Sequence, residues 1–123
     1  MDERDPANRL AVRAACEVAV TAPNPEEAEA LGRMAVERRL AACAQVSGPI
    51  TSTYWWDGEV TSATEWTVTL KTSLDRRDAL MGVLRDAHSY EVPQIVATTI
   101  DGDPDYLAWI EAETSGDPGT STR

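Results

Sequence analysis

Two long extended segments meet at a two-residue turn, and this hairpin restricts the possible folds more than any other part of the chain. Asp57-Gly58 favours a type I′ turn, in which both central residues need a positive φ. Directly before it stand Tyr54, Trp55 and Trp56, in a chain with four tryptophans and three tyrosines. A lone two-stranded tip does not bury two indoles and a phenol. We therefore expect these rings to contact another part of the chain or another copy of it.

The segments around this hairpin alternate between strand and helix patterns. Strands are expected at residues 14–21, 41–56, 60–72 and 94–100, and helices at residues 25–39 and 74–87, with a short helix from residue 103. The second strand is interrupted near Gly48-Pro49, because proline does not donate to a sheet ladder, so a bulge or bend is expected there. These elements account for most of residues 14–114.

Polar residues next to the helical patterns predict where the helices begin. Asn24 with Pro25 has the pattern of an N-cap followed by proline at the first helical position. Thr72 and Asp75 resemble a capping box for the second helix. Asp103 has the pattern of an N-cap for the last helix.

The element order is β-α-β-β-α-β with a C-terminal helix, which predicts an α+β, ferredoxin-like fold with one antiparallel sheet and helices on one face. The hairpin is longer than the two helices can cover, because a strand rises roughly 3.3 Å per residue and a helix 1.5 Å. An exposed aromatic hairpin is an aggregation hazard unless a partner covers it, so a homo-oligomer is expected. One domain at residues 14–114 and flexible tails at residues 1–13 and 115–123 complete this prediction.

The charge of the chain argues against several classes of partner. The formal net charge is −10, and Lys71 is the only lysine, so nucleic-acid binding is not expected. Cations are the more natural partners, although a net negative charge also serves solubility alone. The charged first residues and the lack of a long apolar run predict a cytoplasmic protein without a membrane span. Cys16 and Cys43 are too few for a disulfide framework, and Cys16 is interpreted as a core residue.

Six sequence blocks, in order, resemble the CutA divalent-cation tolerance family over about residues 14–114. They are VTAP (20–23), RLAAC (39–43), YWWDGE (54–59), LKT (70–72), HSYEVPQI (88–95) and PDYLAWI (104–110). The resemblance implies a homotrimer similar in architecture to PII-type signalling proteins, with the hairpins packing across subunits through Tyr54, Trp55 and Trp56. It also implies a role in tolerance of divalent metals, copper above all. Ser89 stands where proline is usual in the family, an exchange expected to loosen its loop.

Cys43, His88 and Glu91 are the candidate metal ligands. Cys43 and His88 match family positions, a thiolate with an imidazole suits copper, and Glu91 could add a carboxylate. No local ligand spacing joins them, so a site would depend on the fold or on assembly. The alternative is that Cys43 is a small buried hydrophobe and His88 a residue favoured by the helix dipole. Copper or another divalent cation would then be a ligand that folding does not require.

Lys71, Tyr90 and Trp109, with Glu91, match family positions that could line a cleft between subunits. Lys71 would offer an anion contact there, or alternatively form an ion pair with Glu91. The chain has one histidine, no Gly-x-Ser-x-Gly motif and no glycine-rich phosphate loop, so no enzymatic activity is expected. Two functions therefore stand beside copper tolerance: a PII-like module that holds a small anion, and a stable scaffold with an indirect metal phenotype.

Overall fold

The computed structural model describes residues 15–115. The two tails expected to be flexible lie outside this range, except for Ser115, which ends the last helix. The elements are β1 (Ala15–Ala22), α2 (Pro25–Glu37), β2 (Cys43–Trp56), β3 (Glu59–Ser73), α3 (Arg77–Ala87), β4 (Ile95–Ile100) and α4 (Pro104–Ser115). No helix within residues 15–115 is long and apolar enough to cross a membrane.

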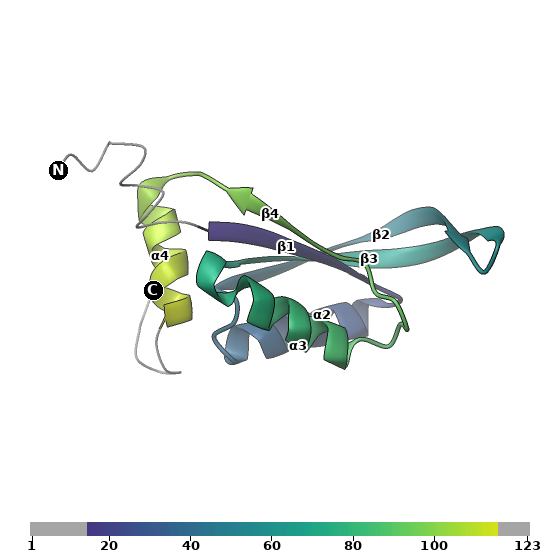
Figure 1. Cartoon of the computed structure of the whole chain (residues 1–123), viewed down its shortest axis with the longest axis horizontal. Coiled ribbons are helices and arrows are strands. Elements are labelled where there is room, and N and C mark those ends of the chain that lie inside the picture. The colour runs from purple at the N-terminus through teal and green to yellow at the C-terminus, as the bar shows by residue number, and fades with distance from the viewer. Residues whose placement is uncertain (1–14, 116–123) are drawn as a thin grey trace.

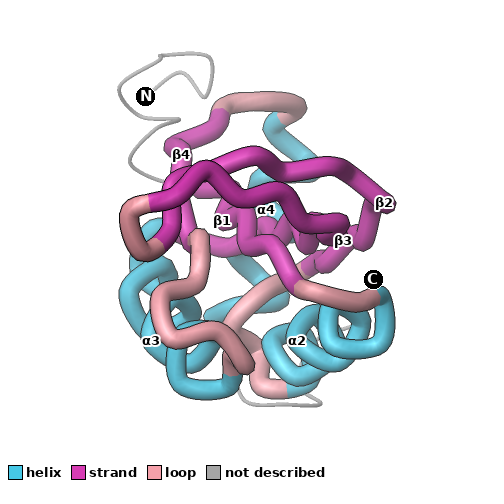
Figure 2. The backbone as a smooth tube through the Cα atoms, turned by 90° about the vertical axis from the view of Figure 1, so that its right-hand side faces the viewer, coloured by secondary structure: helices cyan, strands magenta, loops and turns pink. Residues whose placement is uncertain are grey.

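The four strands form one antiparallel sheet in the order β2-β3-β1-β4. Helices α2 and α3 lie side by side on one face of this sheet, and α4 packs at the end opposite the hairpin tip (Figures 1 and 2). The predicted ferredoxin-like arrangement with its additional C-terminal helix is therefore confirmed. The edge strands are β2 and β4.

The core lies between the sheet and the two helices. Period-two alternation along β3 directs Val68 and Leu70 inward, where both are fully buried. Leu80 and Leu84 of α3, which lie four residues apart on one helix face, are fully buried in the same cluster. A second, smaller cluster of Ala15, Leu107 and Ile110 packs α4 against the sheet.

The predicted helix starts are correct at two places and wrong at one. The Asn24 carboxamide accepts a hydrogen bond from the Glu27 N–H at 2.7 Å, and the Asp103 carboxylate accepts one from the Tyr106 N–H at 3.1 Å. The Thr72–Asp75 capping box is wrong, because β3 continues to Ser73 and Thr72 is buried within the sheet. A 3₁₀ turn at Leu74–Arg76 leads into α3 instead.

The hairpin of β2 and β3 pairs from Cys43 with Lys71 to Trp56 with Glu59. Asp57 has φ 52° and Gly58 has φ 78°, as the predicted type I′ turn requires. The register shifts between Ser47 and Ile50, where the Gly48–Pro49 peptide bond is cis, so the expected bulge is also confirmed. Figure 1 shows that the tip projects well beyond α2 and α3.

Candidate functional site

The loop between α3 and β4 is fixed to the body of the fold by His88. The His88 side chain is fully buried. Its Nδ1 accepts a hydrogen bond from the Tyr90 N–H at 3.0 Å, which requires an unprotonated Nδ1, so Nε2–H donates to the Thr21 carbonyl at 2.6 Å. Both ring nitrogens are therefore engaged within the chain. As a metal ligand, His88 would first have to give up one of these hydrogen bonds.

Ser89, which replaces the usual proline of the family, adds a second attachment for this loop. The Ser89 N–H and hydroxyl both donate to Glu27 Oε2 of α2, at 3.1 and 2.9 Å. A proline at this position has no N–H and no hydroxyl, so neither hydrogen bond could form. The expected loosening by Ser89 is offset by these two hydrogen bonds.

Tyr90 connects the same loop to the hairpin. Its hydroxyl donates to Oε2 of Glu65 on β3 at 3.0 Å, and Glu65 is only 5% exposed. Burial, followed by the hydrogen bond to Glu65 and the negative charge of that carboxylate, raises the pKa of Tyr90 to about 12. The phenol therefore remains a hydrogen-bond donor over the whole physiological pH range.

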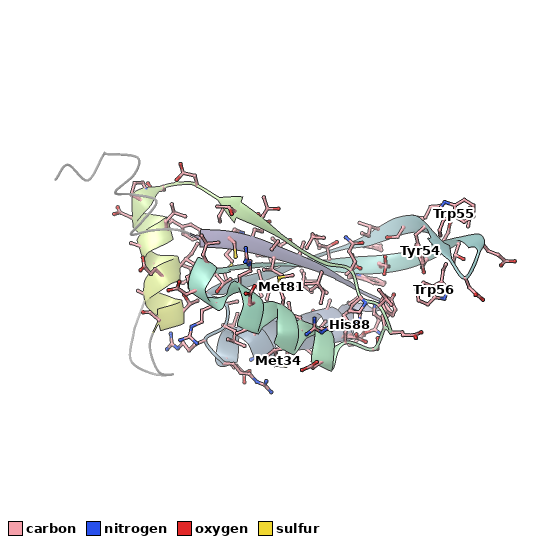
Figure 3. All side chains as sticks on the ribbon, viewed as in Figure 1. Met34, Tyr54, Trp55, Trp56, Met81 and His88 are labelled. Carbon is pink, nitrogen blue, oxygen red and sulfur yellow. The ribbon has the colours of Figure 1, made fainter. Side chains whose placement is uncertain are left out.

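A groove of about 770 Å³ lies between the loop and the hairpin. Its walls include Tyr54 and Trp56 from β2, Glu65 from β3, and Tyr90, Glu91 and Val92 from the loop. Residues two apart on a strand share a face, so Tyr54 and Trp56 project together. Figure 3 shows Trp56 on the side of the hairpin where α3 and His88 lie. The structure thus brings together the aromatic tip with Tyr90 and Glu91, two residues expected in a cleft, of which Glu91 is also an expected metal ligand.

The three expected metal ligands do not converge within one chain. No group of three or more His, Cys, Asp or Glu side chains in residues 15–115 is placed to hold a metal ion. Cys43 pairs with Lys71, and Lys71 pairs with Glu17, four residues before Thr21 on β1. At roughly 3.3 Å per strand residue, Cys43 is about 13 Å along the sheet from the Thr21 carbonyl that holds His88.

Lys71 and Trp109 also lie away from the groove. The Lys71 ammonium donates to Gln45 at 3.1 Å, so the ion pair with Glu91 is not formed. Trp109 of α4 stacks on Tyr106 with ring centroids 5.6 Å apart and packs against the small cluster around Ala15. The residues expected in one cleft are therefore divided between the two ends of the sheet.

Glu65 and Glu27 are the residues of this region that the sequence interpretation did not select. The alternation along β3 places Glu65 with the polar residues of that strand. This pattern does not predict that the loop at Tyr90 covers the Glu65 carboxylate. Glu27 lies in the first turn of α2, where the helix dipole favours a negative charge, and this position does not predict its contact with Ser89. Both contacts join segments that are far apart in the sequence.

The fold and this region define a small ferredoxin-like protein with a projecting aromatic hairpin and a groove at the base of the hairpin. The chain matches the family described as CutA1 divalent ion tolerance protein over residues 16–113. It therefore belongs to this family.

Several relatives agree with this assignment. The chain is 37% identical to the divalent-cation tolerance protein CutA of Archaeoglobus fulgidus, over 75% of this chain and 90% of the relative. It is 36% identical to the mouse protein CutA over 84% of this chain, but this match spans only 59% of the mouse protein. The structure of CutA from Xylella fastidiosa superposes with a TM-score of 0.80 at 31% identity, covering 82% of this chain and 98% of that one. A structure of the Archaeoglobus protein, described as periplasmic, has a TM-score of 0.79 at 33% identity and covers 82% of this chain and 99% of its own.

Proposed function

We propose that this chain contributes to tolerance of divalent cations as a homotrimer, binding divalent metal weakly and catalysing no reaction. The hairpin carries the proposal of assembly. Trp55 is 74% exposed and Val60 60% exposed on a tip that its own helices do not cover. Burying apolar area of this kind stabilises an assembly by about 25 cal/mol per Å². A symmetric trimer of the PII type would cover all three tips with equivalent contacts.

Sedimentation equilibrium of the whole chain tests the assembly. We expect a mass three times the 13.4 kDa of one chain. Trp55→Ser should shift the equilibrium toward smaller species, because the replacement removes the most exposed large apolar side chain of the tip. Val36→Ser is a matched control, since Val36 is also partly exposed but lies on α2. A single-chain mass for the unmodified protein would contradict the proposal.

The net charge of −10 supports binding of cations. A single chain does not assemble Cys43, His88 and Glu91, so we propose that a metal site combines ligands from neighbouring copies. Cys43 and Glu91 are its first candidates, and His88 would join only after losing a hydrogen bond. Copper titration by calorimetry tests this. Cys43→Ala and Glu91→Gln should each weaken binding, and unchanged affinity and stoichiometry in both variants would contradict the proposed ligands.

The alternative of a PII-like module that holds a small anion has less support. Lys71 already donates to a neutral Gln45 side chain and is paired with Glu17 of the neighbouring strand β1. An anion near Lys71 would also meet the field of an acidic chain. A shift in melting temperature with nucleotides or organic anions, lost in Lys71→Gln, would favour this alternative instead.

The proposal places the protein in the cytoplasm. Both cysteines, Cys16 and Cys43, are free thiols, as a reducing compartment favours. The Archaeoglobus relative is described as periplasmic, so the compartment requires its own test. Recovery of the chain with periplasmic markers after osmotic shock would contradict a cytoplasmic location.

A further inference from the structure

We propose that the groove between the hairpin and the loop at residues 88–94 binds a small organic cation with a methylated ammonium group. The groove shares Glu91 with the proposed metal site, but its ligand differs in kind from an inorganic cation. Its volume of about 770 Å³ is ample for such a molecule. Of the four aromatic residues that line it, Tyr54, Trp56 and Tyr90 contribute to the recognition of an ammonium group, and the buried carboxylate of Glu65 contributes separately.

Glu65 provides the charge. It is 5% exposed, and among residues 15–115 no lysine, arginine or histidine forms an ion pair with its carboxylate. Tyr90 donates to Oε2 and thereby fixes the carboxylate, while no donor in the described part of the chain hydrogen-bonds Oε1. A buried charge without a counterion is costly, and a cation that enters the groove reduces that cost.

Aromatic walls define the kind of cation. Tyr54, Trp56 and Tyr90 all line the groove, and Tyr54 is near enough to Tyr90 to affect its ionisation. Aromatic faces attract a cation through the ring quadrupole, and quaternary ammonium groups are recognised by such walls. Val92, which is 68% exposed, offers apolar contact for the hydrocarbon part of the ligand.

An inorganic divalent ion fits this groove poorly. Such ions need several ligands at once, and no group of three or more His, Cys, Asp or Glu side chains in residues 15–115 is placed to supply them. A methylated ammonium group needs no coordination sphere. The proposed contact between copies need not occupy the groove either: although Trp55 is one of the residues that line it, the Trp55 ring lies on the opposite side of the hairpin from Trp56 (Figure 3).

Binding of choline to the full chain, in its own oligomeric state, tests this site by calorimetry and tryptophan fluorescence. The matched ligand control is the neutral analogue of choline with a tert-butyl group in place of trimethylammonium. We expect choline to bind about tenfold or more tightly than this analogue, because the two differ in charge and hardly in shape. Equal affinities, or no choline binding, would overturn the proposal. In the second case the groove is covered by another copy or has no cationic ligand.

Two variants and a control locate the bound cation. Glu65→Gln retains an acceptor for the Tyr90 hydroxyl but removes the charge, so choline affinity should fall about tenfold or more. Trp56→Leu removes one aromatic wall and should weaken binding several-fold; since Trp56 is 49% exposed, this variant keeps the test valid if Glu65→Gln fails to fold. Glu37→Gln changes an exposed acid of α2 outside the groove and should have no effect. Unchanged affinity in a folded Glu65→Gln or Trp56→Leu protein would also overturn the site.

Discussion

Strand β3 runs from the body of the fold into the projecting hairpin, and its surroundings in the two regions are opposite. Leu70 of β3 is fully buried beneath the helices, whereas Val60 of the same strand is 60% exposed near the tip. Both positions have strand-forming apolar residues, so the difference comes from what covers them and not from local propensity. Alternation along a strand therefore shows which face is apolar. It does not show whether that face is covered by the same chain or by another.

The loop at residues 88–94 joins these two regions. His88 attaches it to β1, Ser89 attaches it to α2, and Tyr90 attaches it to Glu65 at the base of the hairpin. These are polar, directional contacts at the boundary of an apolar core. The groove lies where this loop faces the hairpin, so its shape depends on both regions at once.

The two regions should differ most in how the stability loss caused by a substitution depends on protein concentration. Leu70→Ala should lower the free energy of unfolding by about 2–5 kcal/mol, because it leaves a cavity in the core. This loss should persist at every protein concentration. Trp55→Ala should instead destabilise only the assembled protein. Its loss of stability should therefore grow with protein concentration and be small for a dissociated chain. Urea unfolding at several protein concentrations measures the stability loss of each variant. A loss for Trp55→Ala that does not depend on concentration would contradict the proposed difference between the two regions.

Replacing a glycine by alanine should destabilise the protein more at the bulge, where the hairpin leaves the body, than at the tip. Gly48 has φ 151°, and an added Cβ would lie 2.5 Å from Trp66 Cδ1, so Gly48→Ala should cost about 1–3 kcal/mol or more. Gly58 at the tip has φ 78° with no atom within 4 Å of an added Cβ. Gly58→Ala should therefore cost only about 1–2 kcal/mol, from the backbone conformation alone. Thermal unfolding of the two variants compares them, and equal losses would contradict the close packing of Gly48.

Tyr90→Phe should weaken the connection between the regions in a pH-dependent way. At neutral pH we expect a loss of about 1–3 kcal/mol, because the buried Glu65 loses its donor. The pKa of Tyr90 rises from 10.0 to about 12 on folding, so the unfolded chain loses the phenol proton first. The stability contributed by the phenol is therefore complete below about pH 10 and decreases toward pH 12.

Ultraviolet titration of phenolate absorbance checks this assignment. One of the three tyrosines should ionise last in the folded protein, and that late step should be missing in Tyr90→Phe. If the late step persisted in the variant, Tyr90 would not be the buried donor to Glu65.

The smallest expected effect is a gain in the body of the fold. Gly82 lies within α3, and the nearest atom to an added Cβ is a terminal Arg85 nitrogen at 4.0 Å. Gly82→Ala should stabilise the protein by about 0.5–1 kcal/mol, because alanine loses less backbone entropy in a helix. A loss measured by urea unfolding would show that α3 tolerates no side chain at this position.

Much of the fold is predictable because its signals are local. The Asn24 cap, the Asp57-Gly58 turn and the bulge at Pro49 each depend on residues that are neighbours in the sequence, and the structure confirms all three. The Thr72–Asp75 capping box is equally local but wrong, since strand pairing of Thr72 with Cys16 extends β3 past the expected boundary. At Thr72, strand pairing therefore overrides the local preference for a helix cap.

The candidate site is less predictable because its contacts join distant segments. Tyr90 and the Tyr54–Trp56 segment both belong to the family blocks, and they line one groove. The family blocks do not show that Cys43 and Lys71 lie far along the sheet, because that separation follows from strand register. Nor do they indicate Glu65, whose burial depends on a loop that follows it by more than twenty residues.

Hydroxyl-radical footprinting of Trp55 tests most directly the central claim that another copy covers the hairpin tip. Within one chain the Trp55 side chain is 74% exposed, so an isolated chain should be oxidised rapidly there. The account predicts slow oxidation of Trp55 in the assembled protein and a marked increase on dilution to the single chain, read by mass spectrometry of the tryptic peptides. Rapid oxidation of Trp55 at all concentrations would contradict it.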